Sequence, residues 1–283
     1  MHAGHQMPRA EIGDTFLYRD TDTLLSRAAW VDGMGVAVKS AMVLPGNPER
    51  GASRLNGAVT LLSETTAELE AVIDFRLVTK WKTAGDSLLG ALTLARPDSR
   101  NILIVGAGTV AGTLIQAYSA GFPDARFTVW NRTPAGAEKL AAAYPGIAVA
   151  ADLAEAVASA DIIACGTMTT DPILQGDWLR PGQHVDLIGA YRADMREVDD
   201  TALTRSRIFV DSFATTVDHI GELKIPLAQG TISRDDVLAD FYDLGTPTFA
   251  RQSDEEITLF KNGGGAHLDL MTARYILERW QSR

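Results

Sequence analysis

The stretch "ILIVGAGTVAG", residues 102–112, joins a short apolar run to three small residues at fixed spacing. Gly106 allows a tight turn after a strand, Gly108 lets backbone approach a pyrophosphate, and Ala111 permits close packing of a helix on the sheet. A helical pattern follows directly at residues 109–120. The stretch therefore predicts the first strand–helix unit of a dinucleotide-binding domain. The alternative is a glycine turn in an α/β domain that binds no ligand.

Short apolar runs and helical patterns alternate through the rest of this region. Five apolar runs follow in order, and the last ends at residue 212: "RFTVW", "GIAVA", "DIIACG", "HVDLIGA" and "RIFVDS". Such alternation is typical of βαβ units and a parallel sheet. The first ninety-odd residues instead predict strands, including residues 35–44 and a hairpin around "SETTAE", followed by a helix capped by Thr79 and ended by Pro97. Residues 263–280 predict an amphipathic helix after a glycine break.

Composition narrows the class of protein. The chain has 283 residues, a net charge of −10 and a 46% hydrophobic fraction, which suits two domains or one large α/β unit. An acidic chain without a basic cluster disfavours binding to nucleic acid or to an anionic membrane. The N-terminus has no apolar signal-peptide region, and the single cysteine, Cys165, excludes an intramolecular disulfide and a cysteine-cluster metal site. We expect a cytoplasmic protein without a metal.

The predicted cofactor site extends beyond the glycine turn. The helix N-terminus at Thr109 and Val110 offers free N–H groups and a positive dipole end to phosphates. At the tip of the next strand, an NAD site would usually have Asp or Glu, but here Asn131, Arg132 and Thr133 follow. A guanidinium can bind a 2′-phosphate that a carboxylate would repel, which favours NADP(H) over NAD(H). An exposed surface arginine is the alternative.

Lys39 is a candidate for proton transfer. On a strand it shares one face with Ala37, Ala41 and Val43, and the opposite face is also mostly apolar. Partial burial lowers a lysine pKa, as a proton-transfer role requires. A lysine at a sheet edge whose amine reaches solvent is the alternative.

Four long stretches resemble the ornithine cyclodeaminase/mu-crystallin family of NAD(P)-dependent proteins. They are "VAVKSAMVLPGNPERG", "VTKWKTAGDSLLGALTLAR", "IGAYRADMREVD" and "TLFKNGGGAHLD". The resemblance implies an α/β fold in which a doubly wound Rossmann sheet, residues 96–264, is inserted in an α+β substrate and dimerisation domain, residues 1–95 with 265–283. It also implies a homodimer. "MPRAEIG" resembles a segment that in relatives follows an N-terminal helical region, so we expect the first domain to be short at its N-terminus.

The resemblance also assigns residues. It implies that Lys39 acts beside the imine or amino carbon of a small imino or amino acid, and that Lys82 stands where the family usually has Arg. It matches Asp269 to the acid of the closing helix. An ion pair of Lys82 with Asp86 is the alternative. The expected substrate-binding residues are Arg9, Lys39, Lys82, Tyr191 and Gly263. The expected cofactor-binding residues are Lys82, Thr83, Gly106, Gly108, Thr109, Val110, Asn131, Arg132, Thr133, Gly166, Thr167, Met168, Ile188 and Asn262.

Tyr191 separates two reaction schemes. A cyclodeaminase of this family relies on an acid at that position, and tyrosine, with an ordinary pKa of about 10, is a much poorer base. We therefore expect NADPH-dependent reduction of a cyclic imino acid, pyrroline-2-carboxylate or piperideine-2-carboxylate, to the L-amino acid. The alternatives are an ornithine cyclodeaminase, an L-amino acid dehydrogenase, and a non-catalytic NADP(H)-binding protein of the crystallin kind.

Overall fold

The computed structural model describes all residues from Met1 to Arg283 and consists of two compact units. Unit 1 comprises Met1–Lys82 and Gly265–Arg283, and unit 2 comprises Thr83–Gly264. The first boundary lies at 82/83 and not at the predicted 95/96, because a single helix, α2 (Phe75–Leu94), runs through it. The second half of α2 contributes Ala84 and Ala91 to the core of unit 2. A boundary inside a continuous helix leaves no turn or linker in the sequence to mark it.

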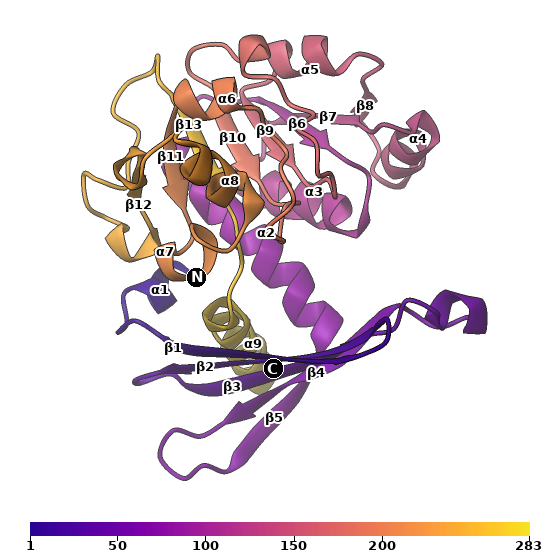
Figure 1. Cartoon of the computed structure of the whole chain (residues 1–283), viewed down its shortest axis with the longest axis vertical. Helices are drawn as coiled ribbons and strands as arrows, with labels where there is room; N and C mark the ends of the chain where they lie inside the picture. The colour runs from indigo at the N-terminus through magenta and orange to yellow at the C-terminus, as the bar shows by residue number, and fades with distance from the viewer. The chain divides into compact units, whose positions relative to one another are not determined.

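Unit 1 is an antiparallel sheet with one helix on it. The strands β1 (Glu11–Arg19), β2 (Asp22–Val31), β3 (Gly35–Val43), β4 (Leu55–Leu62) and β5 (Leu69–Asp74) are neighbours in chain order. The C-terminal helix α9 (Ala266–Gln281) packs on one face of this sheet (Figure 1). A short helix α1 (His2–His5) precedes β1, and a 3₁₀ turn (Asn47–Arg50) follows β3.

The start of α2 corrects one prediction. The helix begins at Phe75, four residues before Thr79, so Thr79 does not cap it. The carboxylate of Asp74 accepts a hydrogen bond from Leu77 N instead, which satisfies a first-turn amide as a capping side chain does.

Unit 2 is a Rossmann-type sheet of eight parallel strands in the order β12-β11-β13-β10-β9-β6-β7-β8. The strands are β6 (Asn101–Val105), β7 (Arg126–Trp130), β8 (Ala148–Val149), β9 (Ile162–Cys165), β10 (His184–Leu187), β11 (Ser206–Val210), β12 (Val237–Ala239) and β13 (Ile257–Lys261). The helices are α3 (Thr109–Gly121), α4 (Pro134–Ala143), α5 (Leu153–Ser159), α6 (Asp200–Thr204), α7 (Phe213–Thr216) and α8 (Gly221–Gln229), and the 3₁₀ turns are Gly176–Trp178, Arg234–Asp236 and Phe241–Asp243. The doubly wound fold expected from the sequence is confirmed.

Two strands were missed by the sequence pattern. Strand β13 inserts between β10 and β11, and β12 extends the sheet beyond β11. All five residues of β13 are buried, including the polar Thr258 and Lys261, so its sequence resembles neither a continuous apolar run nor an alternating one. Strand β12 has only three residues, too few to show a period.

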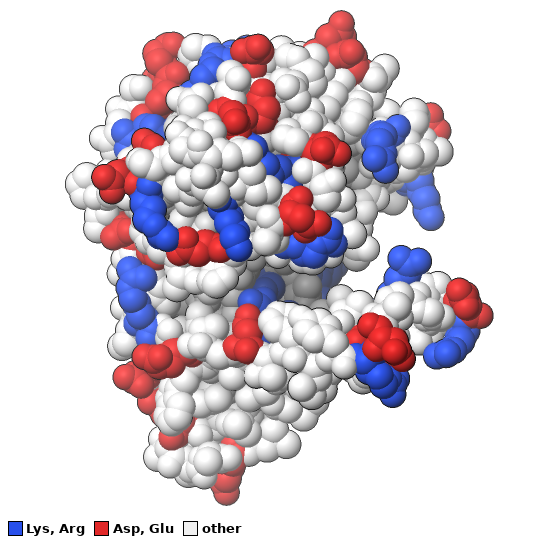
Figure 2. All heavy atoms as spheres, in the orientation of Figure 1, with Lys and Arg blue, Asp and Glu red and all other residues white.

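The surface carries both signs of charge. On the face drawn in Figure 2, basic and acidic side chains are interspersed rather than gathered by sign. None of the helices combines the length with the apolar character that a bilayer crossing demands.

Candidate active site

The glycine turn of unit 2 lies where the strand order reverses. The chain runs from β6 to β7 and β8 on one side, then returns to β9 on the other side of β6. Gly106 has φ +105°, and an added Cβ would lie 3.0 Å from Gly166 O at the tip of β9. Such a reversal opens a crevice at the carboxyl ends of the strands, the usual ligand site of this fold. The turn therefore has the backbone that a dinucleotide site requires.

The residues after the turn are open to a ligand. A Cβ at Gly108 would meet nothing within 4 Å, and no side chain caps α3, which begins at Thr109 and Val110. Ala111 is buried against the sheet core. An uncapped helix N-terminus presents N–H groups to an anion. These residues fit the pyrophosphate of a dinucleotide cofactor.

The three residues predicted to bind the 2′-phosphate follow β7 and have different surroundings. Asn131 Oδ1 accepts from Ala107 N at 3.1 Å, and its Nδ2 donates to Thr133 O at 2.8 Å. The Asn131 amide therefore links the glycine turn to the loop that follows β7. Arg132 and Thr133 are exposed, which leaves them available to a phosphate.

The tips of β9 and β10 carry the other predicted cofactor residues. Gly166 and Ile188 are half-buried, and Met168 is 76% exposed. Thr167 donates from both its N and its Oγ1 to the carboxylate of Glu197, at 2.7 and 2.9 Å. Glu197 is not among the predicted residues, because a lone acid in a loop eight residues past Gly189 has no recognisable pattern.

In unit 1, Lys39 belongs to a buried ion triad. Its Nζ donates to Asp269 Oδ1 at 3.0 Å and to Thr79 Oγ1 at 3.2 Å. Lys82 Nζ lies 3.5 Å from the same Asp269 oxygen, so Lys82 forms an ion pair with Asp269. Lys39 and Lys82 are 4% and 6% exposed, and Asp269 is 1% exposed. One carboxylate oxygen thus pairs with two lysine side chains.

The environment changes the acidity of Lys39. Burial, helped by the charge of Lys82, lowers the pKa of Lys39 to about 8, although Asp269 opposes the shift. The ring of Phe75, 4.6 Å from Nζ, adds an apolar wall with a cation–π contact. A lysine with this pKa can both hold and release a proton near neutral pH.

The remaining predicted residues lie in different surroundings. Arg9 is on the exposed segment between α1 and β1. Tyr191 is 56% exposed and stacks on the guanidinium of Arg192. Asn262 Nδ2 donates to Thr83 O and to Ser87 Oγ, at 3.0 and 2.9 Å.

Gly263 is held by a second buried acid that the sequence analysis did not single out. Asp211 accepts from Gly263 N and Gly264 N, at 3.0 and 2.6 Å. A Cβ at Gly263 would lie 2.1 Å from Thr216 Oγ1. Position 263 therefore requires glycine, because a larger side chain would collide with Thr216 in unit 2.

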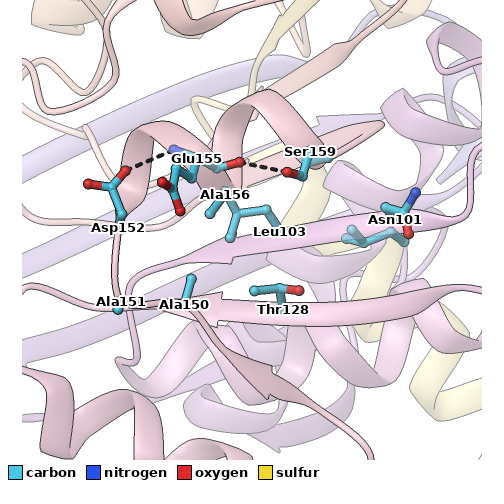
Figure 3. Close-up of a pocket in the computed structure, with 11 residues that line it drawn as sticks. Asn101, Leu103, Thr128, Ala150, Ala151, Asp152, Glu155, Ala156 and Ser159 are labelled. Atoms are coloured by element: carbon cyan, nitrogen blue, oxygen red, sulfur yellow. Dashed lines mark hydrogen bonds between the residues drawn. The ribbon is translucent and has the colours of Figure 1, made fainter.

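A hollow of about 330 Å³ in unit 2 lies elsewhere (Figure 3). It is lined by residues of β6, β7 and α5, among them Asn101, Thr128 and Glu155. Two hydrogen bonds of its wall lie within α5 and its N-cap, where Glu155 N donates to Asp152 Oδ1 and Ser159 Oγ donates to Glu155 O. No predicted site residue lines this hollow.

The family model and the similar proteins point to one family. The model of the ornithine cyclodeaminase/mu-crystallin family matches residues 28–283. A Delta(1)-pyrroline-2-carboxylate reductase of Paracoccus denitrificans is 50% identical over 98% of this chain and 89% of its own length. The ketimine reductase mu-crystallin of Rattus norvegicus is 32% identical over 80% of this chain and 70% of its own length.

A solved structure has the same fold. It is the Thermococcus litoralis Delta(1)-pyrroline-2-carboxylate reductase in complex with NADH and L-proline, with a TM-score of 0.89 and 25% identity. The match covers 99% of this chain and 91% of the other.

Proposed function

The chain belongs to the ornithine cyclodeaminase/mu-crystallin family, and we propose that it is an NAD(P)H-dependent oxidoreductase that reduces a cyclic imino acid to the L-amino acid. Pyrroline-2-carboxylate and piperideine-2-carboxylate are the proposed substrates. The reductase of Paracoccus denitrificans, at 50% identity over nearly the whole chain, supports this choice. The exposed Tyr191 in place of an acid supports reduction over ammonia release.

The observation that carries the proposal is the triad of Lys39, Lys82 and Asp269. Two ammonium groups and one carboxylate sum to one positive charge in a buried place. A buried net charge is costly unless it is paired. A substrate with one carboxylate would supply the missing charge, and Arg9 and Lys82 are the proposed partners of that carboxylate.

Lys39 is the proposed proton donor. Reduction of a ring imine adds a hydride to carbon and a proton to nitrogen, and bound NAD(P)H supplies the hydride. The Lys39 Nζ–H bond breaks as the new N–H bond forms on the ring nitrogen, and Lys39 then regains a proton from water. Asp269 and Thr79 hold the Nζ atom from two sides.

We also propose a preference for NADPH. Arg132 and Thr133 are exposed at the tip of β7, where a 2′-phosphate binds in this fold. Asn131 braces the turn beneath them. Gly106, Gly108, Thr109 and Val110 are the proposed pyrophosphate site.

Steady-state assays test the function. We expect both ring imines to drive NADPH oxidation, with production of L-proline or L-pipecolate. Ornithine with NAD(P)⁺ serves as the contrasting substrate. Release of ammonia from ornithine without net change of cofactor would refute the proposal.

A further inference from the structure

The carboxylate of Glu197 joins the tips of two neighbouring strands. Its Oε1 accepts from Thr167 N and Oγ1 after β9, at 2.7 and 2.9 Å. Its Oε2 accepts from Gly189 N and Ala190 N after β10, at 2.6 and 3.3 Å. Glu197 is 0% exposed. Four donors therefore meet one buried carboxylate, two donors on each oxygen.

The two tips lie so close that their backbones touch. A Cβ at Gly189 would lie 1.8 Å from Thr167 O and 2.4 Å from Thr167 N. The strands also bond directly at this point, where Ile188 N donates to Cys165 O at 2.8 Å. Beyond that bond, Glu197 is the side chain that accepts from both loops.

Glu197 is itself fixed in place. The carboxylate of Glu222 accepts from Glu197 N and Val198 N, at 2.8 and 3.1 Å. Burial and the neighbouring charge of Glu197 raise the pKa of Glu222 to about 7. Four donated bonds occupy both oxygens of the Glu197 carboxylate as acceptors. This geometry fits a structural role in the loops and not a proton transfer to substrate.

We propose that Glu197 is a positioning residue that holds the tips of β9 and β10 at the spacing that receives the nicotinamide half of the cofactor. This rests on the proposed function, which assigns Gly166, Thr167, Met168 and Ile188 to that half. Glu197 acts beneath the loops, through their backbone, and does not reach the substrate, so it does not substitute for the acid absent from position 191.

The test compares binding of whole and truncated cofactors. The variants are Glu197→Gln, Thr167→Val, and Glu255→Gln as a matched control on the exposed surface of the same unit. Binding of NADPH and of 2′-phospho-ADP-ribose, which lacks nicotinamide, is measured by calorimetry. NADH and ADP-ribose form a parallel pair. Thermal unfolding of each variant is recorded without ligand.

Glu197→Gln replaces one acceptor oxygen by a donor that faces an N–H group. The bonds of Glu197 are made within the protein, so their loss acts on the cofactor only through the displaced loops. A displacement that breaks one charge-assisted hydrogen bond to the cofactor would weaken binding about tenfold. We expect that loss for NADPH and a change of less than about twofold for 2′-phospho-ADP-ribose, whose contacts lie at other strand tips. Thr167→Val removes one donor and should show a smaller loss in the same sense. The control should match wild type.

Two results would overturn the inference. One is wild-type NADPH affinity in both variants, which would mean that the bridge does not matter. The other is an equal loss of both ligands in both variants, which would mark a purely structural role. Wild type that binds none of the four ligands would refute the proposed function as well, whereas cofactor binding without imine reduction would refute only the substrate assignment.

Discussion

At the scale of single residues, Asp269 decides how Lys39 behaves. The same carboxylate oxygen that orients Lys39 also attracts Lys82, and the Asp269 Oδ2 atom has no hydrogen-bond partner. The acid raises the Lys39 pKa, while burial and the charge of Lys82 lower it. The pKa near 8 is therefore a balance that one substitution can shift.

The pH dependence of imine reduction tests that balance. The ammonium form of Lys39 is the proposed donor, so kcat should fall as pH rises through about 8. Asp269→Asn removes a charge that raises this pKa, so the falling limb should move to lower pH. Lys39→Met should reduce kcat by roughly 10²- to 10⁴-fold at neutral pH, with Lys80→Met, on the exposed side of α2, as control. An unmoved limb in Asp269→Asn contradicts the assignment.

Arg132 governs the choice of cofactor in our proposal. Arg132→Ala should raise the KM for NADPH by about tenfold, because a charge-assisted hydrogen bond to phosphate contributes roughly 1.5–3 kcal/mol. The KM for NADH should change little, since NADH has no 2′-phosphate. The same ratio of KM values in Arg132→Ala and in wild type would exclude this role. Arg100→Ala, on the exposed surface of unit 2, is the control.

A functional residue can be predicted from the sequence when the pattern of its sequence neighbours shows that it is buried. Lys39 stands out because alternation places it between Ala37 and Ala41, and both are buried beside it. Glu197 and Asp211 do not stand out, because each has partners among backbone amides far away in the sequence, Thr167 N for Glu197 and Gly264 N for Asp211. A contact between segments that only the fold brings together has no local sequence pattern, so it cannot be predicted from a single sequence.

At the scale of elements, the β6–α3 turn contains two glycines with different tasks. Gly106 is needed for its positive φ and for its contact with Gly166 O. Gly108 has φ −79° and open space beside it, so the protein alone does not require a glycine there. The motif placed both glycines between a strand and a helix, as in the structure, and the approach of Gly108 to a pyrophosphate stays a prediction.

Alanine at each position separates them. Gly106→Ala should lower stability by about 1–3 kcal/mol, the typical cost of a strained backbone, seen as a lower midpoint in urea. Gly108→Ala should unfold like wild type yet lose NADPH affinity, because its methyl group would occupy the pyrophosphate site. Wild-type NADPH affinity in Gly108→Ala would place the pyrophosphate elsewhere.

The elements most easily predicted were those with a clear period. The β4–β5 hairpin, the strands from β6 to β11 and helix α9 follow from alternation, apolar runs and glycine breaks. Helix α2 starts earlier than predicted because Asp74, and not Thr79, satisfies its first turn. The helix also spans both units, and no local signal shows which half packs in which core.

At the scale of the whole molecule, the sheet of unit 1 has one face without cover. Helix α9 covers the face of Ala37, Val59 and Leu61. Strand register places Trp30 beside Val36 and Val36 beside Leu62 on the other face. Trp30 is 51% exposed and Val72, on β5, is 61% exposed. A broad apolar face on a sheet is typical of an interface between proteins.

We propose that a second copy of the chain covers this face, which gives the homodimer expected from the family. The double variant Trp30→Glu with Val72→Glu puts two like charges on the face, and burying them unpaired costs several kcal/mol. Light scattering should show a dimer for wild type and a monomer for the variant. Val149→Glu, on the exposed edge strand β8 of unit 2, should leave the dimer intact. Trp30 and Val72 lie in unit 1, whereas the proposed NADPH site lies in unit 2, so NADPH binding should survive in the monomer. A dimer that persists with both glutamates would place the interface on another surface.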